Sequence, residues 1–141
     1  MLLAVVGLIL LLIVIGALAG GEEAASDVAN QEANASTVEP ALEVTARELF
    51  NAYDANEVAA QQTYGGQRLK VTGTVQGVTL DFMDNPVVQL ATSNEFLPVQ
   101  ALLDDANAAA AITKGSSISL VCEDLTEVIG APQLGGCAIA P

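Results

Sequence analysis

The stretch RLKVTGTVQGVTLDF, at residues 68–82, constrains the fold more than any other part of the chain. Apolar and polar residues alternate along it, as in a β-strand with one buried face. The apolar row of its first half is Leu69, Val71 and Val75. After Gly77 the row changes phase and continues as Val78, Leu80 and Phe82. Because a glycine at a phase change is typical of a bulge or sharp coil, we expect one long, bent strand that serves two sides of a small barrel.

Shorter segments complete the strand pattern. Strands are predicted at residues 87–92, 98–103, 116–125 and 133–140, and turns at residues 83–86, 93–96 and 127–132. Between the third and fourth strands, Asp104 and Asp105 precede an alanine-rich segment that ends at Gly115, which predicts a short capped helix. Three strands, a helix and two strands form the order of an OB-fold. The sequence therefore predicts a mainly β domain, a five-stranded OB-fold barrel.

A longer helix is predicted before the barrel, at residues 45–62. Thr45 and Glu48 form a T-x-x-E capping box at its start, and Asn56 is a candidate interruption. One apolar stripe recurs at helical spacing: Leu42, Ala46, Leu49, Phe50 and Tyr53. The pair Gly65–Gly66 then ends the segment, as a left-handed cap allows. We expect the stripe to pack onto the sheet.

The first 21 residues are apolar and contain no charged side chain. They are long enough to span a bilayer, so one interpretation is an uncleaved transmembrane anchor. The other is a signal peptide, cleaved after Ala17-Leu18-Ala19. Residues 22–41 are small, polar and acidic, which predicts a flexible linker before a domain at residues 42–141. We expect a single-pass membrane protein with its domain on the extracytoplasmic side, or a secreted or periplasmic protein after cleavage.

The chain is strongly acidic, with 17 acids, 4 bases and a formal net charge of −13. The predicted barrel holds three of the bases, Arg68, Lys70 and Lys114. Since phosphate binding depends on Lys and Arg, this composition argues against nucleic acid as a partner. The chain has no His, no G-x-S-x-G elbow and no glycine-rich phosphate loop, and we therefore predict no enzymatic activity, no catalytic residues and no cofactor.

The two cysteines fall in the fourth and fifth predicted strands, at Cys122 and Cys137. These strands are antiparallel neighbours in an OB-fold barrel, so the two side chains can approach each other. An exported protein lies where disulfides persist, and a disulfide is the favoured interpretation; two buried free thiols are the alternative. Two cysteines without histidine make an incomplete zinc site, so we predict no metal site there.

Several segments together resemble a known family. They are LFNAYDANEVAAQQTYGGQRLKVTGTV, DFMDNPVVQLAT, VQALLDD, ITKGSSISLVCEDL and GGCAIA. They resemble the tRNA-anticodon-binding-like (tRNA_anti-like) OB-fold family of small bacterial membrane-anchored or exported proteins, over about residues 49–139. The block at residues 52–60 is its most specific part. The resemblance implies an OB-fold and an N-terminal membrane segment or lipoprotein signal, and it implies no particular activity.

The candidate contact residues lie in the loops after the first and second predicted strands. They are Asp81, Phe82, Asp84, Asn85, Asn94 and Phe96. Asp81, Asp84 and Asn85 also offer oxygens to a cation, but turn capping is their expected role and we predict no metal. The leading hypothesis is a non-enzymatic binding module for a peptide, a glycan or an envelope protein. The alternative is single-stranded nucleic-acid binding, for which Arg68, Lys70 and Gln76 would line an outer face.

Overall fold

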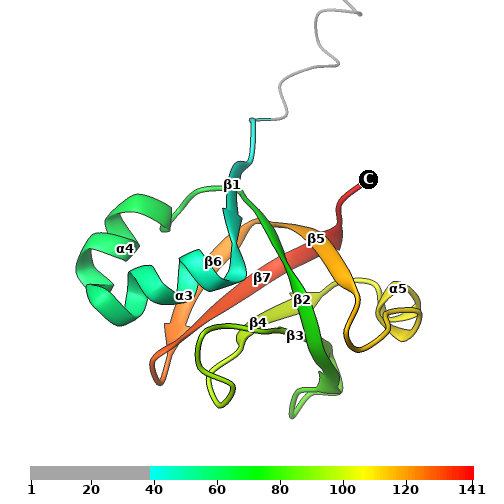
Figure 1. Ribbon diagram of the computed structural model, residues 1–141. Helices are drawn as coiled ribbons and strands as arrows, with labels where there is room; N and C mark the ends of the chain where they lie inside the picture. Colours follow the sequence, from blue (N-terminus) through cyan, green and yellow to red (C-terminus); the bar gives the residue numbers. More distant parts are fainter. Residues whose placement is uncertain (1–38) are drawn as a thin grey trace, which may run out of the picture. The chain divides into compact units, whose positions relative to one another are not determined.

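The computed structural model describes residues 39–141, which form one compact unit. Its elements, in chain order, are β1 (Leu42–Thr45), α3 (Ala46–Ala55), α4 (Glu57–Tyr64), β2 (Leu69–Leu80), β3 (Pro86–Leu90), β4 (Val99–Leu103), α5 (Ala106–Ala110), β5 (Ser117–Cys122), β6 (Asp124–Val128) and β7 (Ala131–Ile139) (Figure 1). The segment predicted at residues 1–21 and nearly all of the predicted linker lie outside the described residues. Between residues 39 and 141, no helix has the length and apolar character needed to cross a bilayer.

Five strands close into a barrel. The hydrogen-bonded order is β2-β3-β4-β7-β5, and β5 pairs again with β2. All pairs in this ring are antiparallel except β4 with β7, which is parallel. The helix α5 connects β4 to β5, as the predicted OB-fold order requires. The five predicted barrel strands and the helix between the third and fourth are therefore confirmed.

The long strand β2 bends as predicted, because it pairs with different strands along its length. Its first half pairs with β5, its second half pairs with β3, and the register shifts between Val75 and Gly77. The first-half row of Leu69, Val71 and Val75 is buried, as expected. The second-half row is not: Val78, Leu80 and Phe82 are exposed. Beyond Gly77 the strand continues into a hairpin with β3, and the barrel core does not cover these side chains.

The predicted N-terminal helix is two helices, divided at Asn56. Asn56 ends α3 and caps α4, with its side-chain oxygen accepting a hydrogen bond from Ala59 N at 3.0 Å. The predicted capping box is present, because Thr45 Oγ1 accepts from Glu48 N and Glu48 Oε2 accepts from Thr45 N. Leu42, however, is not part of the helical stripe. The N-cap residue Thr45 has an extended backbone, and the residues before it are extended as well. They form β1, which pairs in parallel with β2.

The helix α3 packs its apolar stripe against the barrel. Its buried residues are Ala46, Leu49, Phe50 and Tyr53. The start of the helix lies close to β2, because a Cβ atom at Gly73 would lie 3.1 Å from Ala46 Cβ and 3.3 Å from Leu90 Cβ. The glycine therefore allows the helix and the barrel wall to approach more closely than a side chain would permit.

The predicted fourth strand at residues 116–125 is wrong beyond Cys122. The chain bends at Glu123, and β6 then pairs with β7 in an antiparallel hairpin. Cys122 and Leu125 are both buried but lie three residues apart, and one regular strand cannot turn both to the same side. The predicted turn at residues 127–132 shrinks accordingly to Ile129 and Gly130, which both have positive φ angles.

Candidate ligand-binding face

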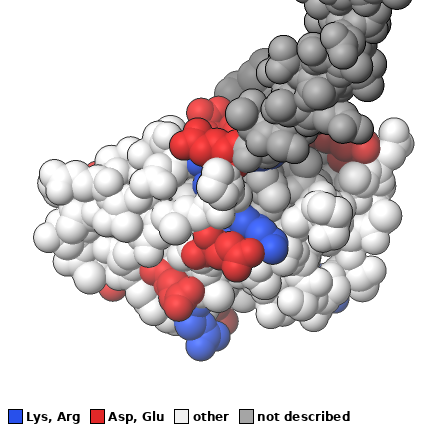
Figure 2. Space-filling model, turned by 90° about the horizontal axis from the view of Figure 1, so that it is seen from above, with Lys and Arg blue, Asp and Glu red and all other residues white. Residues whose placement is uncertain are grey.

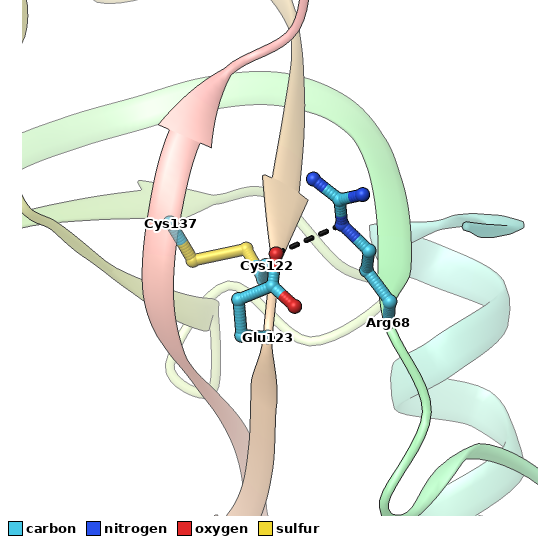
Figure 3. Close-up of a disulfide and its surroundings, with 4 residues drawn as sticks. All are labelled: Arg68, Cys122, Glu123 and Cys137. Atoms are coloured by element: carbon cyan, nitrogen blue, oxygen red, sulfur yellow. Dashed lines mark ion pairs between the residues drawn. A yellow bond between two sulfur atoms is a disulfide. The ribbon is translucent and has the colours of Figure 1, made fainter. Parts of the chain in front are cut away.

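The cysteines form the predicted disulfide, and its place in the fold is structural. Cys122 and Cys137 are both buried in the core, and the bridge links β5 to β7 (Figure 3). The last paired residues of these strands are Val121 and Ala138, so the bridge joins the next two opposing residues. It thus holds the two strands together where the hydrogen-bonded ladder between them stops.

The residues expected to line a phosphate-binding face are engaged within the protein. Arg68 Nε lies 2.8 Å from Glu123 Oε1, beside the disulfide (Figure 3). Lys70 Nζ lies 2.8 Å from Glu43 Oε1, and this ion pair lowers the pKa of Glu43. Gln76 Nε2 donates to a backbone carbonyl of the β3–β4 connection at 2.8 Å. These three side chains therefore support the barrel and do not form a free cationic surface.

The remaining charge is predominantly negative. Residues 39–141 contain thirteen acids and four bases. Within this part of the chain, Arg47 and Lys114 are the two bases without an ion-pair partner. Figure 2 shows that the larger basic areas on the viewed face border acidic ones. The domain has no concentrated positive patch among its described residues, and phosphate binding would need one.

The connection between β2 and β3 is held together by Asp81. Its Oδ1 accepts hydrogen bonds from Met83 N at 2.7 Å and Asn85 N at 2.9 Å, and its Oδ2 accepts from Asn85 Nδ2 at 3.0 Å. These bonds, chiefly those from Asn85, lower the pKa of Asp81. Asp84 has a φ of 64°, and Phe82 is 95% exposed. Asp81 and Asn85 thus have the predicted turn-capping role, and the turn projects Phe82 into solvent.

The connection between β3 and β4 is likewise held by hydrogen bonds between its own side chains and its backbone. The hydroxyl of Thr92, which is buried, lies 2.8 Å from Asn94 O and 3.0 Å from Leu97 O. Asn94 Oδ1 accepts a hydrogen bond from Phe96 N at 3.0 Å. Phe96 is nevertheless 82% exposed. The Asn94 side chain therefore stabilises the loop through this hydrogen bond, and the Phe96 side chain is exposed to solvent.

A third connection, between β6 and β7, was missed as a candidate site. Val128 is exposed, and Ile129 is 90% exposed at the tip of the hairpin. A Cβ atom at Gly130 would lie 4.0 Å from Leu97 Cδ1, so this hairpin lies next to the β3–β4 connection. The signal for it was an apolar Val-Ile pair inside a segment predicted to be a turn, where polar residues are the norm.

We call the exposed bulky apolar residues in or next to these three connections the loop-tip surface: Phe82, Met83, Phe96, Val128 and Ile129. In Figure 1 the three connections lie along the lower edge of the domain. The chain enters the described domain at the opposite edge, just before β1 (Figure 1). Bulky apolar side chains gathered at one edge of a small domain mark an interaction site more than isolated ones do.

A row of uncharged polar residues crosses the outer face of the barrel near this surface. We call Gln89, Gln100 and Gln133 the glutamine row; they are register partners on β3, β4 and β7. Their neighbours along each strand are buried, so these side chains point outward and are partly exposed. Within residues 39–141 none of their side-chain amides is hydrogen-bonded to another group. The row offers both donors and acceptors and carries no charge.

A shallow apolar hollow adjoins the β2–β3 connection. It has a volume of about 220 Å³ and lies between the hairpin and α5. Its lining residues are Val78, Thr79, Leu80, Pro86, Ala106, Ala109 and Ala110. The helix is short and capped by Asp105, whose Oδ1 accepts from Asn107 N and Ala108 N. Among the described residues no cluster of His, Cys, Asp or Glu could hold a metal ion.

The comparisons with known proteins agree with this architecture. The tRNA_anti-like family matches residues 1–130. A similar solved structure comes from Klebsiella pneumoniae subsp. pneumoniae and is described as a "putative nucleic acid-binding lipoprotein". It has a TM-score of 0.50 and 16% sequence identity, and the match covers 70% of this chain and 92% of that chain, which supports the fold alone. No curated protein matches the sequence. The chain belongs to the tRNA_anti-like family of OB-fold proteins.

Proposed function

We propose that this protein is a non-catalytic binding module that works on the extracytoplasmic side of the membrane. Its ligand is a peptide, a glycan or an envelope protein, bound by the loop-tip surface and the adjoining glutamine row. The observation that carries the proposal is the set of five exposed bulky apolar residues on three connections at one edge of the barrel. OB-folds commonly bind their ligands with loops and the outer face of the sheet.

Two features support the extracytoplasmic location. A disulfide buried in the core persists in oxidising compartments and is rare in the cytosol. Residues 2–21 carry no charged side chain, as expected for a segment that anchors or exports the domain.

Nucleic acid is the competing ligand, because the similar Klebsiella structure is described as a "putative nucleic acid-binding lipoprotein". The negative charge of this domain argues against nucleic-acid binding by this chain. The strands that hold the glutamine row contain no Lys, Arg or aromatic residue, and no base lies between residues 71 and 113. Single-stranded nucleic acids are bound by cationic grooves with stacking aromatic residues. This face has neither, and the net negative charge of the domain repels a phosphate chain.

Photo-cross-linking tests the proposal while the ligand is still unidentified. Benzoylphenylalanine is placed at position 82 or 96 of the full chain in intact cells, and mass spectrometry assigns each adduct to protein, glycan or nucleic acid. Position 58 is the matched control, because Val58 on α4 is 68% exposed and lies outside the loop-tip surface. We expect protein or glycan adducts from positions 82 and 96 and none from position 58. Nucleic-acid adducts, or equal yields from position 58, would contradict the proposal.

A further inference from the structure

Acids lie next to the apolar side chains of the loop-tip surface. Asp84 follows Met83, Glu95 precedes Phe96, and Glu127 precedes Val128. These three acids take part in neither of the two ion pairs within residues 39–141. A partner for the apolar residues must therefore approach through a negative potential.

The three connections themselves contain no base, and the nearest is Arg47 on α3, which lines a cavity together with Ala91 at the start of the β3–β4 connection. The four bases of the chain are Arg47, Arg68, Lys70 and Lys114, and none lies in the β2–β3, β3–β4 or β6–β7 connection. Uncompensated charges focus the local field, steer oppositely charged partners and repel like ones. The field at this edge therefore favours Lys and Arg on the partner and disfavours anionic lipid, acidic glycan and nucleic acid.

The adjoining groups suit a polypeptide chain. The glutamine row presents free amide donors and acceptors at successive strands, which match the donors and acceptors of peptide groups. The hollow beside the β2–β3 connection is lined by apolar residues except for Thr79 and measures about 220 Å³, which is room for apolar side chains. A neutral sugar polymer would use the amides but carries no positive charge, so it would gain nothing from the negative potential at this edge.

We infer that the ligand is a polypeptide segment of an exported protein in which apolar residues are combined with Lys or Arg. The apolar side chains cover Phe82, Phe96 and Ile129, and the basic side chains pair with Asp84, Glu95 and Glu127. This inference rests on the proposed function and narrows its ligand to one class. The charge complementarity of the loop-tip surface carries it.

Three matched synthetic peptides of twelve residues test the inference. Each alternates valine with one other residue, which is lysine, serine or glutamate. Fluorescence anisotropy measures their binding to the full chain in nanodiscs. We expect the lysine peptide to bind at least tenfold more tightly than the serine peptide, and the glutamate peptide to bind more weakly than either. The affinity of the lysine peptide should fall steeply as salt is added.

Two charge variants test whether the preference for the lysine peptide depends on Asp84, Glu95 and Glu127. In the triple variant Asp84→Asn, Glu95→Gln and Glu127→Gln, the preference for the lysine peptide should fall at least tenfold. The control removes the same charge elsewhere: Glu39→Gln, Asp54→Asn and Glu57→Gln. Its preference should stay within about twofold of the wild type. Equal effects of the two variants, or equal binding of the serine and lysine peptides, would overturn the inference.

An apolar variant separates this inference from the proposed function. Phe82→Ser with Phe96→Ser should weaken all binding at least tenfold, and Val58→Ser should not. If cross-links form from positions 82 and 96 but none of the three peptides binds, the inference fails and the proposed function stands. If positions 82 and 96 give no more cross-linking than position 58, the proposed function fails, and the inference fails with it.

Discussion

The disulfide provides the sharpest quantitative prediction. Cys122 and Cys137 are separated by 15 residues along the chain, and the loop that their bridge closes contains β6 and the whole β6–β7 hairpin. In the chain-entropy treatment a cross-link over a loop of this length lowers the entropy of the unfolded chain and stabilises the folded state by about 3 kcal/mol. For a domain of this size that corresponds to a fall in Tm on the order of 10–20 °C when the bridge is lost.

The assay compares three forms of the full chain by urea unfolding. They are the oxidised wild type, the wild type reduced in denaturant and kept with reductant, and the double variant Cys122→Ala with Cys137→Ala. The reduced wild type retains both sulfur atoms, so its difference from the oxidised form isolates the cross-link. The double variant loses the sulfur atoms as well, so it reports in addition the packing of two buried side chains.

The expected order of stability is oxidised wild type, then reduced wild type, then the double variant. The first difference should be about 3 kcal/mol. If the oxidised and reduced forms unfold at the same urea concentration, then the bridge does not constrain the unfolded chain, and the structural role assigned to it is refuted. Mass spectrometry of the oxidised form, two daltons lighter than the reduced one, provides the control that the bridge is present.

Five further outcomes are expected, each measured by urea or thermal unfolding. Thr45→Ala removes the N-cap of α3 and should cost about 1 kcal/mol, whereas Thr63→Ala, an exposed residue inside α4, should cost less. Tyr53→Phe removes a hydrogen bond of 2.8 Å to Gln61 and should cost about 1 kcal/mol. Burial, aided by nearby acids, raises the pKa of Tyr53, so the free energy of unfolding should be retained below pH 10 and fall above it. In Tyr53→Phe the part of this decrease that comes from Tyr53 should be absent. Hydrogen bonds from Thr45 lower the pKa of Glu48, so the contribution of Glu48 to stability should be present at neutral pH and lost as the pH falls below about 4. In Glu48→Gln the stability should decrease less steeply over this acidic range. Gly73→Ala should push α3 away from the barrel and cost about 1–3 kcal/mol, and an unchanged Tm would contradict the close approach.

Much of the fold was predictable because the barrel strands carry a clear alternation. The phase change at Gly77 predicted the bulge, and the positions of Cys122 and Cys137 predicted the bridge. Two strands, β1 and β6, were not predicted, for reasons local to each. The strand β1 has one buried residue, Val44, so it has no pattern of its own, and Leu42 fits the helical spacing by coincidence. The strand β6 follows Cys122 without a turn signal, and its existence depends on pairing with β7.

The candidate site was predicted only in part. Phe82 and Phe96 stand out in the sequence because aromatic residues are rare and both lie next to turn residues. The glutamine row could not be recognised, because polar residues that alternate in a strand predict a solvent face and do not reveal which of them align across strands. Alignment depends on register, and the register of β3, β4 and β7 is set by tertiary pairing. The proximity of Ile129 to the β3–β4 connection is likewise a tertiary effect.

Cysteine labelling in intact cells tests the central claim most directly. The two native cysteines are buried and bridged, so a maleimide that cannot cross the cytoplasmic membrane will report on an introduced thiol alone. The variants are Val58→Cys, Phe82→Cys, Phe96→Cys and Ile129→Cys in the full chain, expressed at native level and compared with the purified protein. We predict that position 58 is labelled equally in both settings, and that positions 82, 96 and 129 are labelled in the purified protein but protected in cells. Absence of labelling at position 58 in cells, or equal labelling at all four positions, would contradict an extracytoplasmic domain whose loop-tip surface is occupied by a partner.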